Sequence, residues 1–131
     1  DKMITNLLVA SMFLLFFRIS IETIKVRKKY QVSLGHGDNK YVAKAVSAHS
    51  NFVSYVPFML IMFYLVEVSG EFPKVLLGGV ALAFFVGRLL HFIAFRNKMN
   101  FKLRTLGMHL TVWPMVFLAA CHLYLFFNSL V

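Results

Sequence analysis

Long apolar stretches alternate with short polar connections along the whole chain. About 30 Å of hydrocarbon requires about 20 helical residues at a rise of 1.5 Å per residue, and each apolar stretch is that long. The pattern predicts four membrane-spanning helices, at residues 3–24, 45–66, 75–95 and 105–127. The connections leave no room for a soluble module, so residues 1–131 are expected to form one domain, an all-α integral membrane four-helix bundle.

The first apolar stretch could also be taken for a secretory signal peptide, because it follows Lys2 and has a suitable length. No small-residue cleavage site follows Phe16, Phe17 and Arg18, which favours a retained helix. Arg18 and Glu22 lie one turn apart near the end of this helix, so they are expected to pair.

Composition agrees with a membrane protein, since 60% of the residues are hydrophobic and 15% are charged, against roughly 45–50% and about 25% in soluble domains. The net charge of +9 could indicate nucleic-acid binding. However, most basic residues lie in the connections 25–44 and 96–104, whereas the connection 67–74 carries one base and two acids. The positive-inside rule then places the first and third connections in the cytoplasm and both termini outside it. No nucleic-acid partner is needed to explain the charge.

Polar side chains inside apolar helices are costly in lipid and therefore informative. The second helix carries a polar stripe at three-and-four spacing, formed by Ser47, Ser50, Asn51, Ser54 and Tyr55. Two interpretations stay open: hydrogen bonds between helices, or one wall of a ligand cleft.

The third helix carries Arg88 and His91 one turn apart. Arg88 is expected to find either a partner inside the bundle or a bound anion. Gly79, Ala83 and Gly87 recur every fourth residue and predict a close helix contact.

Arg104 and Thr105 open the fourth helix at the depth of Arg88 and His91. Several cations at one depth suit an anionic ligand with a lipophilic end, although phospholipid headgroups would also suit them.

Other chemistries find little support. The remaining histidines show no metal-ligand spacing, so no metal is expected; they are His36, His49, His109 and His122. No nucleotide motif, paired carboxylates or Ser/His/Asp order occurs. Cys121 stands alone in an apolar stretch and cannot close an intrachain disulfide.

Three motifs resemble the MAPEG family, the membrane-associated proteins in eicosanoid and glutathione metabolism. They are Ala48-His49-Ser50-Asn51-Phe52-Val53-Ser54-Tyr55-Val56-Pro57, then Gly87-Arg88-Leu89-Leu90-His91, then Leu103-Arg104-Thr105-Leu106-Gly107-Met108. The chain is most similar to the short bacterial branch. The resemblance implies a homotrimer in a bacterial inner membrane, with ligand sites between subunits near the cytoplasmic side.

The resemblance also implies roles for individual residues. Arg104 matches the arginine that stabilises the glutathione thiolate, and Thr105 stands where some members carry a hydroxyl residue. A guanidinium favours the reactive thiolate over the thiol. The residues expected to line or support the glutathione pocket are Arg27, Asn51, Tyr55, Arg88 and His91.

The chain departs from the family pattern at three positions. The glutathione users carry an arginine where this chain has Ser47, a glutamate where it has Ser54, and commonly a tyrosine where it has Phe95. Lys44, one turn before Ser47, would replace the lost cation, but nothing replaces the acid.

Three functions follow as hypotheses. The first is a membrane glutathione transferase or peroxidase that acts on lipophilic electrophiles, with glutathione as cosubstrate. The second is a non-catalytic trimer that binds membrane lipid or another anionic amphiphile. The third, a proton-coupled exporter, would need a membrane carboxylate, for which Glu22 is the sole candidate.

Overall fold

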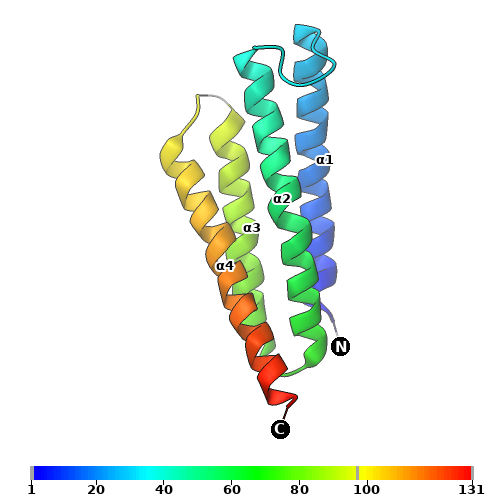
Figure 1. Cartoon of the computed structure of the whole chain (residues 1–131), viewed down its shortest axis with the longest axis vertical. Coiled ribbons are helices and arrows are strands. Elements are labelled where there is room, and N and C mark those ends of the chain that lie inside the picture. The colour runs from blue at the N-terminus through cyan, green and yellow to red at the C-terminus, as the bar shows by residue number, and fades with distance from the viewer. Residues whose placement is uncertain (1, 97, 131) are drawn as a thin grey trace.

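Four long helices account for nearly all of the chain in the computed structural model, which describes residues 2–96 and 98–130. They are α1 (Ile4–Tyr30), α2 (Lys40–Ser69), α3 (Lys74–Arg96) and α4 (Phe101–Asn128), drawn in Figure 1. Each is long and apolar enough to span a membrane. No strand occurs in the described ranges. The predicted all-α membrane bundle is confirmed; of its expected extent 1–131, only Asp1, Asn97 and Val131 lie outside the described residues.

The helices run beyond the predicted limits, most clearly at one end of the bundle. α1 continues past residue 24 to Tyr30, and α2 begins at Lys40 rather than at residue 45. Hydropathy marks where lipid ends, whereas lysine and arginine are good helix formers that extend a helix into water. The helix ends are instead set by caps: Gln31 adopts the left-handed conformation with φ 55°, and Asn39 accepts hydrogen bonds from the backbone N–H groups of Tyr41 and Val42.

The arrangement pairs α1 with α2 and α3 with α4, and contacts between α1 and α3 and between α2 and α4 close the bundle. The connections after α1 and after α3 lie at the same end (Figure 1). The chain termini and the connection after α2 lie at the opposite end. We call the first of these the basic end, because its two connections and the helix turns beside them carry most of the lysines and arginines.

Apolar side chains fill the interior and also cover the outside. Met12, Phe63 and Phe84 are among the buried residues at the centre. Leu14, Phe58 and Trp113 are at least 60% exposed. An outer surface of this kind suits hydrocarbon rather than water.

A close helix contact joins α3 to α4 at Gly87 and Gly107. A Cβ atom built on Gly107 would lie 2.8 Å from the carbonyl oxygen of Gly87 and 2.8 Å from the backbone nitrogen of His91. The expected small-residue contact is therefore confirmed at Gly87. It is not found at Gly79, where an added Cβ would meet nothing within 4 Å.

Glu67 was expected in the polar connection after the second helix, but it lies in α2 and is buried. Its carboxylate accepts hydrogen bonds from the backbone N–H groups of Ile4 (2.6 Å) and Thr5 (2.8 Å) and from the Thr5 hydroxyl (2.6 Å). The N-cap residue of α1, Met3, provides no side-chain cap. Glu67 thus caps α1 from a neighbouring helix, at the end of the bundle opposite the basic end.

Candidate functional site

The polar stripe of α2 faces outward. Ser47, Ser50 and Ser54 are exposed, while Asn51 and Tyr55 are half-buried. The Ser54 hydroxyl donates to the carbonyl of Ser50 in its own helix, at 2.8 Å. Asn51 Nδ2 donates to Met108 Sδ of α4 at 3.5 Å, while its buried Oδ1 has no hydrogen-bond partner. Most polar side chains of the stripe therefore do not bond to another helix of the same chain.

Arg88 is the largest fully buried side chain, with 1% of its surface exposed. Its Nη1 donates to Thr111 Oγ1 at 3.4 Å, and its guanidinium carbon lies 5.4 Å from the centre of the Phe52 ring. Its Nε has no hydrogen-bond partner. Within the described residues no carboxylate forms an ion pair with it. The sequence left open whether Arg88 has a partner inside the bundle. Its partners are the Thr111 hydroxyl and the Phe52 ring, which compensate the positive charge of Arg88 only in part.

Replacing Arg88 by methionine is expected to raise stability by about 1 kcal/mol, because well-packed apolar groups often replace poorly compensated buried charges at a gain. The free cysteine Cys121, 4% exposed, provides the assay, since a thiol-reactive dye labels it as the protein unfolds on heating. Thr111→Val is the control: it keeps the guanidinium, removes its hydroxyl partner and should lower the melting temperature. A larger loss in Arg88→Met than in Thr111→Val would contradict the argument.

His91, Phe95 and Arg104 follow one another in contact at the α3–α4 interface. The His91 ring, 2% exposed, lies 4.9 Å from the Phe95 ring, measured between centroids. The Arg104 guanidinium lies 5.4 Å from the Phe95 centroid on its way to the surface. Phe95 therefore occupies the space between a buried imidazole and an exposed guanidinium.

These groups belong to one cluster. Tyr55 lies within electrostatic range of Arg88, and both Arg88 and Arg104 lie within electrostatic range of His91. Asn51 reaches α4 at Met108, one turn after Arg104. Five of the sequence-predicted site residues are thus brought together from α2, α3 and α4 near the basic end. We call them the cationic cluster: Asn51, Tyr55, Arg88, His91 and Arg104.

Arg104 and Thr105 also line an open cavity of about 470 Å³ on the outer side of α4. Phe101, Met108 and Trp113 supply its apolar wall. The arrangement places one exposed guanidinium and one hydroxyl beside an apolar cleft at the basic end, which can hold an anionic group joined to a lipophilic one.

Arg27 lies elsewhere in the chain. Its Nη1 donates hydrogen bonds to the carbonyls of Val32 (3.3 Å) and Ser33 (3.4 Å), so Arg27 binds the backbone of the connection after α1. It lines a separate cavity of about 270 Å³ between α1 and α2, together with His49. A single chain therefore does not bring Arg27 to the cationic cluster.

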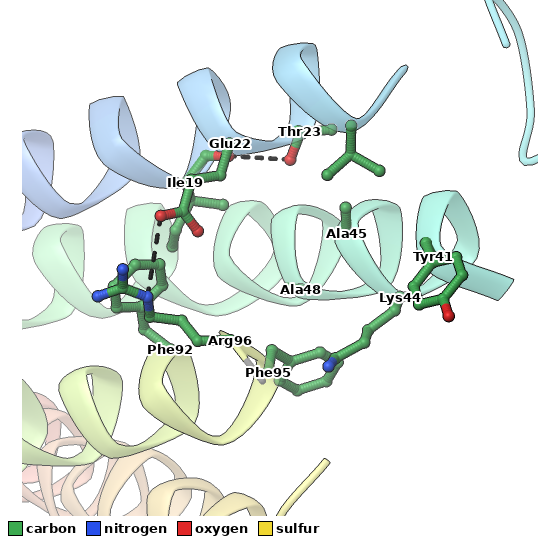
Figure 2. A pocket seen from close by; sticks show the side chains of 11 residues that line it. Ile19, Glu22, Thr23, Tyr41, Lys44, Ala45, Ala48, Phe92, Phe95 and Arg96 are labelled. Atoms are coloured by element: carbon green, nitrogen blue, oxygen red, sulfur yellow. Dashed lines mark hydrogen bonds and ion pairs between the residues drawn. The ribbon is translucent and has the colours of Figure 1, made fainter. Parts of the chain in front are cut away.

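A further pocket, not anticipated from the sequence, lies at the basic end between α1, α2 and α3 (Figure 2). Its charged lining residues are Glu22, Lys44 and Arg96. The expected pair is confirmed, because Arg18 Nη2 lies 2.9 Å from Glu22 Oε1. Arg96 approaches the same oxygen at 4.0 Å. The only sequence signal was charge at the ends of three helices, which does not reveal a cavity.

The part of the chain that the structure describes contains no group of three or more His, Cys, Asp or Glu side chains placed to hold a metal. Its free cysteine, Cys121, is buried.

Comparison with known proteins gives one match. The model of the MAPEG family matches residues 5–124 of the 131-residue chain. No curated protein and no solved structure matches the chain at a significant level. The matched range includes the whole cationic cluster, Thr105 and Arg27.

Proposed function

The chain belongs to the MAPEG family, and from this membership and the cationic cluster we propose that it is a glutathione-dependent transferase or peroxidase acting on lipophilic electrophiles. The observation that carries the proposal is the convergence of Arg88, His91 and Arg104 with Asn51 and Tyr55. Among these residues Arg104 also lines a cleft open to the outer surface. Guanidinium groups pair with carboxylates, and glutathione carries two of them.

In this proposal Arg104 is the catalytic residue. Its exposed guanidinium would stabilise the thiolate of bound glutathione, because a nearby positive charge favours the ionised thiol. The thiol proton would leave to water, and a lipophilic electrophile would enter the apolar cleft from the bilayer. In the transferase reaction the sulfur would bond to the electrophilic carbon as the bond to its leaving group breaks and the leaving group departs with the electron pair. In the peroxidase reaction the sulfur would bond to one peroxide oxygen as the O–O bond breaks, and the other oxygen would leave as an alcohol after taking a proton from water. Thr105 would donate a hydrogen bond beside the sulfur. Most of the rate gain would come from thiol activation and proximity.

We propose further that the protein assembles as a homotrimer. Ser47, Ser50 and Ser54 are exposed on a membrane-spanning helix, and polar groups that face lipid are costly. A second copy of the chain would cover this stripe. It would also allow Arg27 of one subunit to approach Arg104 of the next, which would complete the set of expected glutathione residues.

The basic end would face the cytoplasm, as the positive-inside rule requires, and both termini would lie outside it, in a bacterial inner membrane. Membrane lipid would surround the apolar outer surface.

One observation favours the alternative, a trimer that binds lipid or another anionic amphiphile without catalysis. The Ser54 hydroxyl, where glutathione users carry a glutamate, bonds only to its own helix backbone. This position therefore offers no carboxylate to the amino group of glutathione.

Calorimetry of the detergent-purified protein distinguishes the two functions. The parent protein is expected to bind glutathione at millimolar concentration. Arg104→Ala should weaken binding at least tenfold, since a hydrogen bond to a charged group contributes about 1.5–3 kcal/mol. Lys98→Ala removes an exposed charge from the same end and should leave binding unchanged.

The double variant Ser47→Arg/Ser54→Glu restores the two charges of the family pattern. Binding by this variant but not by the parent would favour the non-catalytic trimer, with a pocket that no longer uses glutathione. Absence of binding in both proteins would contradict glutathione dependence.

A further inference from the structure

A pocket of about 220 Å³, which we call the interhelix pocket, lies inside one chain between α1, α2 and α3. Its apolar lining includes Ile19, Ala48 and Phe92. Glu22 projects from α1, Lys44 and Tyr41 from α2, and Arg96 from α3; the Arg96 guanidinium lies beside Glu22 and Phe92, and the Lys44 amine lies beside Phe95 (Figure 2). The pocket therefore combines apolar walls with a cationic group at each of two ends.

The charges of the pocket favour an anion. Lys44 and Arg96 carry two positive charges against the single carboxylate of Glu22. That carboxylate is already paired with Arg18, which lies 2.9 Å from its Oε1. The contact from Arg96 Nε to the same oxygen is longer, at 4.0 Å, and the Arg96 side chain is 51% exposed. Arg96 can therefore turn toward a ligand while Arg18 keeps Glu22 compensated.

The positions of the donors suit a phosphate group. Lys44 and Arg96 approach from different helices (Figure 2). The Tyr41 ring at the rim stacks on Tyr30 at a centroid distance of 5.3 Å, and its hydroxyl points away from Arg96 (Figure 2). Once the half-exposed Arg96 side chain turns toward Lys44, a guanidinium and an amine from two helices can share the several oxygens of a tetrahedral phosphate.

The size and depth of the pocket indicate where that phosphate comes from. About 220 Å³ is less than the ~300–1,000 Å³ that encloses a drug-sized molecule, so the pocket can hold a headgroup and the start of a chain. The pocket also lies where three apolar helices reach their basic ends, the level at which anionic lipid headgroups meet basic residues. We propose that the interhelix pocket binds the phosphate headgroup of an anionic membrane lipid.

This site differs from the cationic cluster. The two share only a boundary, Phe95, which lines the pocket and also contacts His91 and Arg104. Binding of lipid in the pocket requires no glutathione, so its test is independent of the proposed function.

The experiment reconstitutes the full-length protein in nanodiscs with equal amounts of zwitterionic phosphatidylcholine and anionic phosphatidylglycerol. Native mass spectrometry then counts the lipids that stay bound after release. The parent is expected to retain phosphatidylglycerol in roughly tenfold excess over phosphatidylcholine. Lys44→Gln/Arg96→Gln should abolish the excess, and Lys98→Gln/Lys102→Gln, which removes two exposed charges at the same end, should preserve it.

A variant that keeps every charge separates the pocket from surface attraction. Ala45→Leu adds bulk to the pocket lining and should also abolish the excess. Retention that survives Ala45→Leu, or an equal loss in both double variants, would overturn the proposal. Inorganic phosphate is added at millimolar concentration to a parallel sample. If it displaces the lipid, the proposal that the bound phosphate belongs to a lipid is overturned, and the site is assigned to free phosphate.

Discussion

Replacing Gly107 by alanine is expected to destabilise the protein by at least ~3 kcal/mol, which is the upper part of the range for overpacked sites. The added Cβ would lie 2.8 Å from Gly87 O, 2.8 Å from His91 N and 3.1 Å from His91 Cα. All three are backbone atoms of α3, so no side-chain rotation relieves the contact. The helices would have to separate along the contact that joins α3 to α4.

The measurement is the melting temperature followed through dye labelling of Cys121, where a fall of roughly 10 °C is expected. Gly79→Ala is the matched control, since its Cβ would meet nothing within 4 Å and alanine is the better helix former. It should leave the melting temperature unchanged or raise it slightly. Equal stability of the two variants would show that α3 and α4 are not held at the observed separation.

The separation of α3 and α4 also matters for the cationic cluster. His91 belongs to α3 and Arg104 to α4, and both contact the Phe95 ring. Gly107 lies one turn after Arg104, and a Cβ added to it would meet the His91 backbone. Gly107→Ala is therefore expected to impair ligand binding as well as stability, whereas Gly79→Ala should affect neither.

The fold followed from the sequence because lipid imposes a simple requirement: a spanning helix must be about 20 residues long and mostly apolar. The same requirement says little about helix ends. The prolongation of α1 to Tyr30 and of α2 back to Lys40 depends on capping by Gln31 and Asn39. The connection expected at residues 25–44 is accordingly shorter and occupies residues 31–39.

The candidate site was only partly predictable. Arg88 and His91 lie one turn apart, so their proximity followed from helix geometry, and the family motifs added Asn51, Tyr55 and Arg104. The ring of Phe95 between His91 and Arg104 depends on how α3 crosses α4. The interhelix pocket depends on the packing of three helices, and no local pattern reports such a packing.

Glu67→Ala is expected to cost about 3 kcal/mol, because a hydrogen bond to a charged group contributes about 1.5–3 kcal/mol and the N–H groups left behind are poorly solvated. The carboxylate accepts from two backbone N–H groups and one hydroxyl at the start of α1. Its negative charge also matches the positive end of the helix dipole. Glu67→Gln should lose less, since its amide keeps one acceptor oxygen.

The loss from Glu67→Ala should appear first at the start of α1. Hydrogen exchange of the Ile4 and Thr5 amides is expected to accelerate, while amides of α3 stay protected until global unfolding. Glu71→Ala removes the same charge from an exposed position in the neighbouring connection and should change neither the exchange nor the melting temperature. If the two variants behave alike, α1 is held by apolar packing alone. If only the Glu67 variant has an effect, a side chain of α2 determines where α1 begins, because the N-cap residue Met3 provides no side-chain cap.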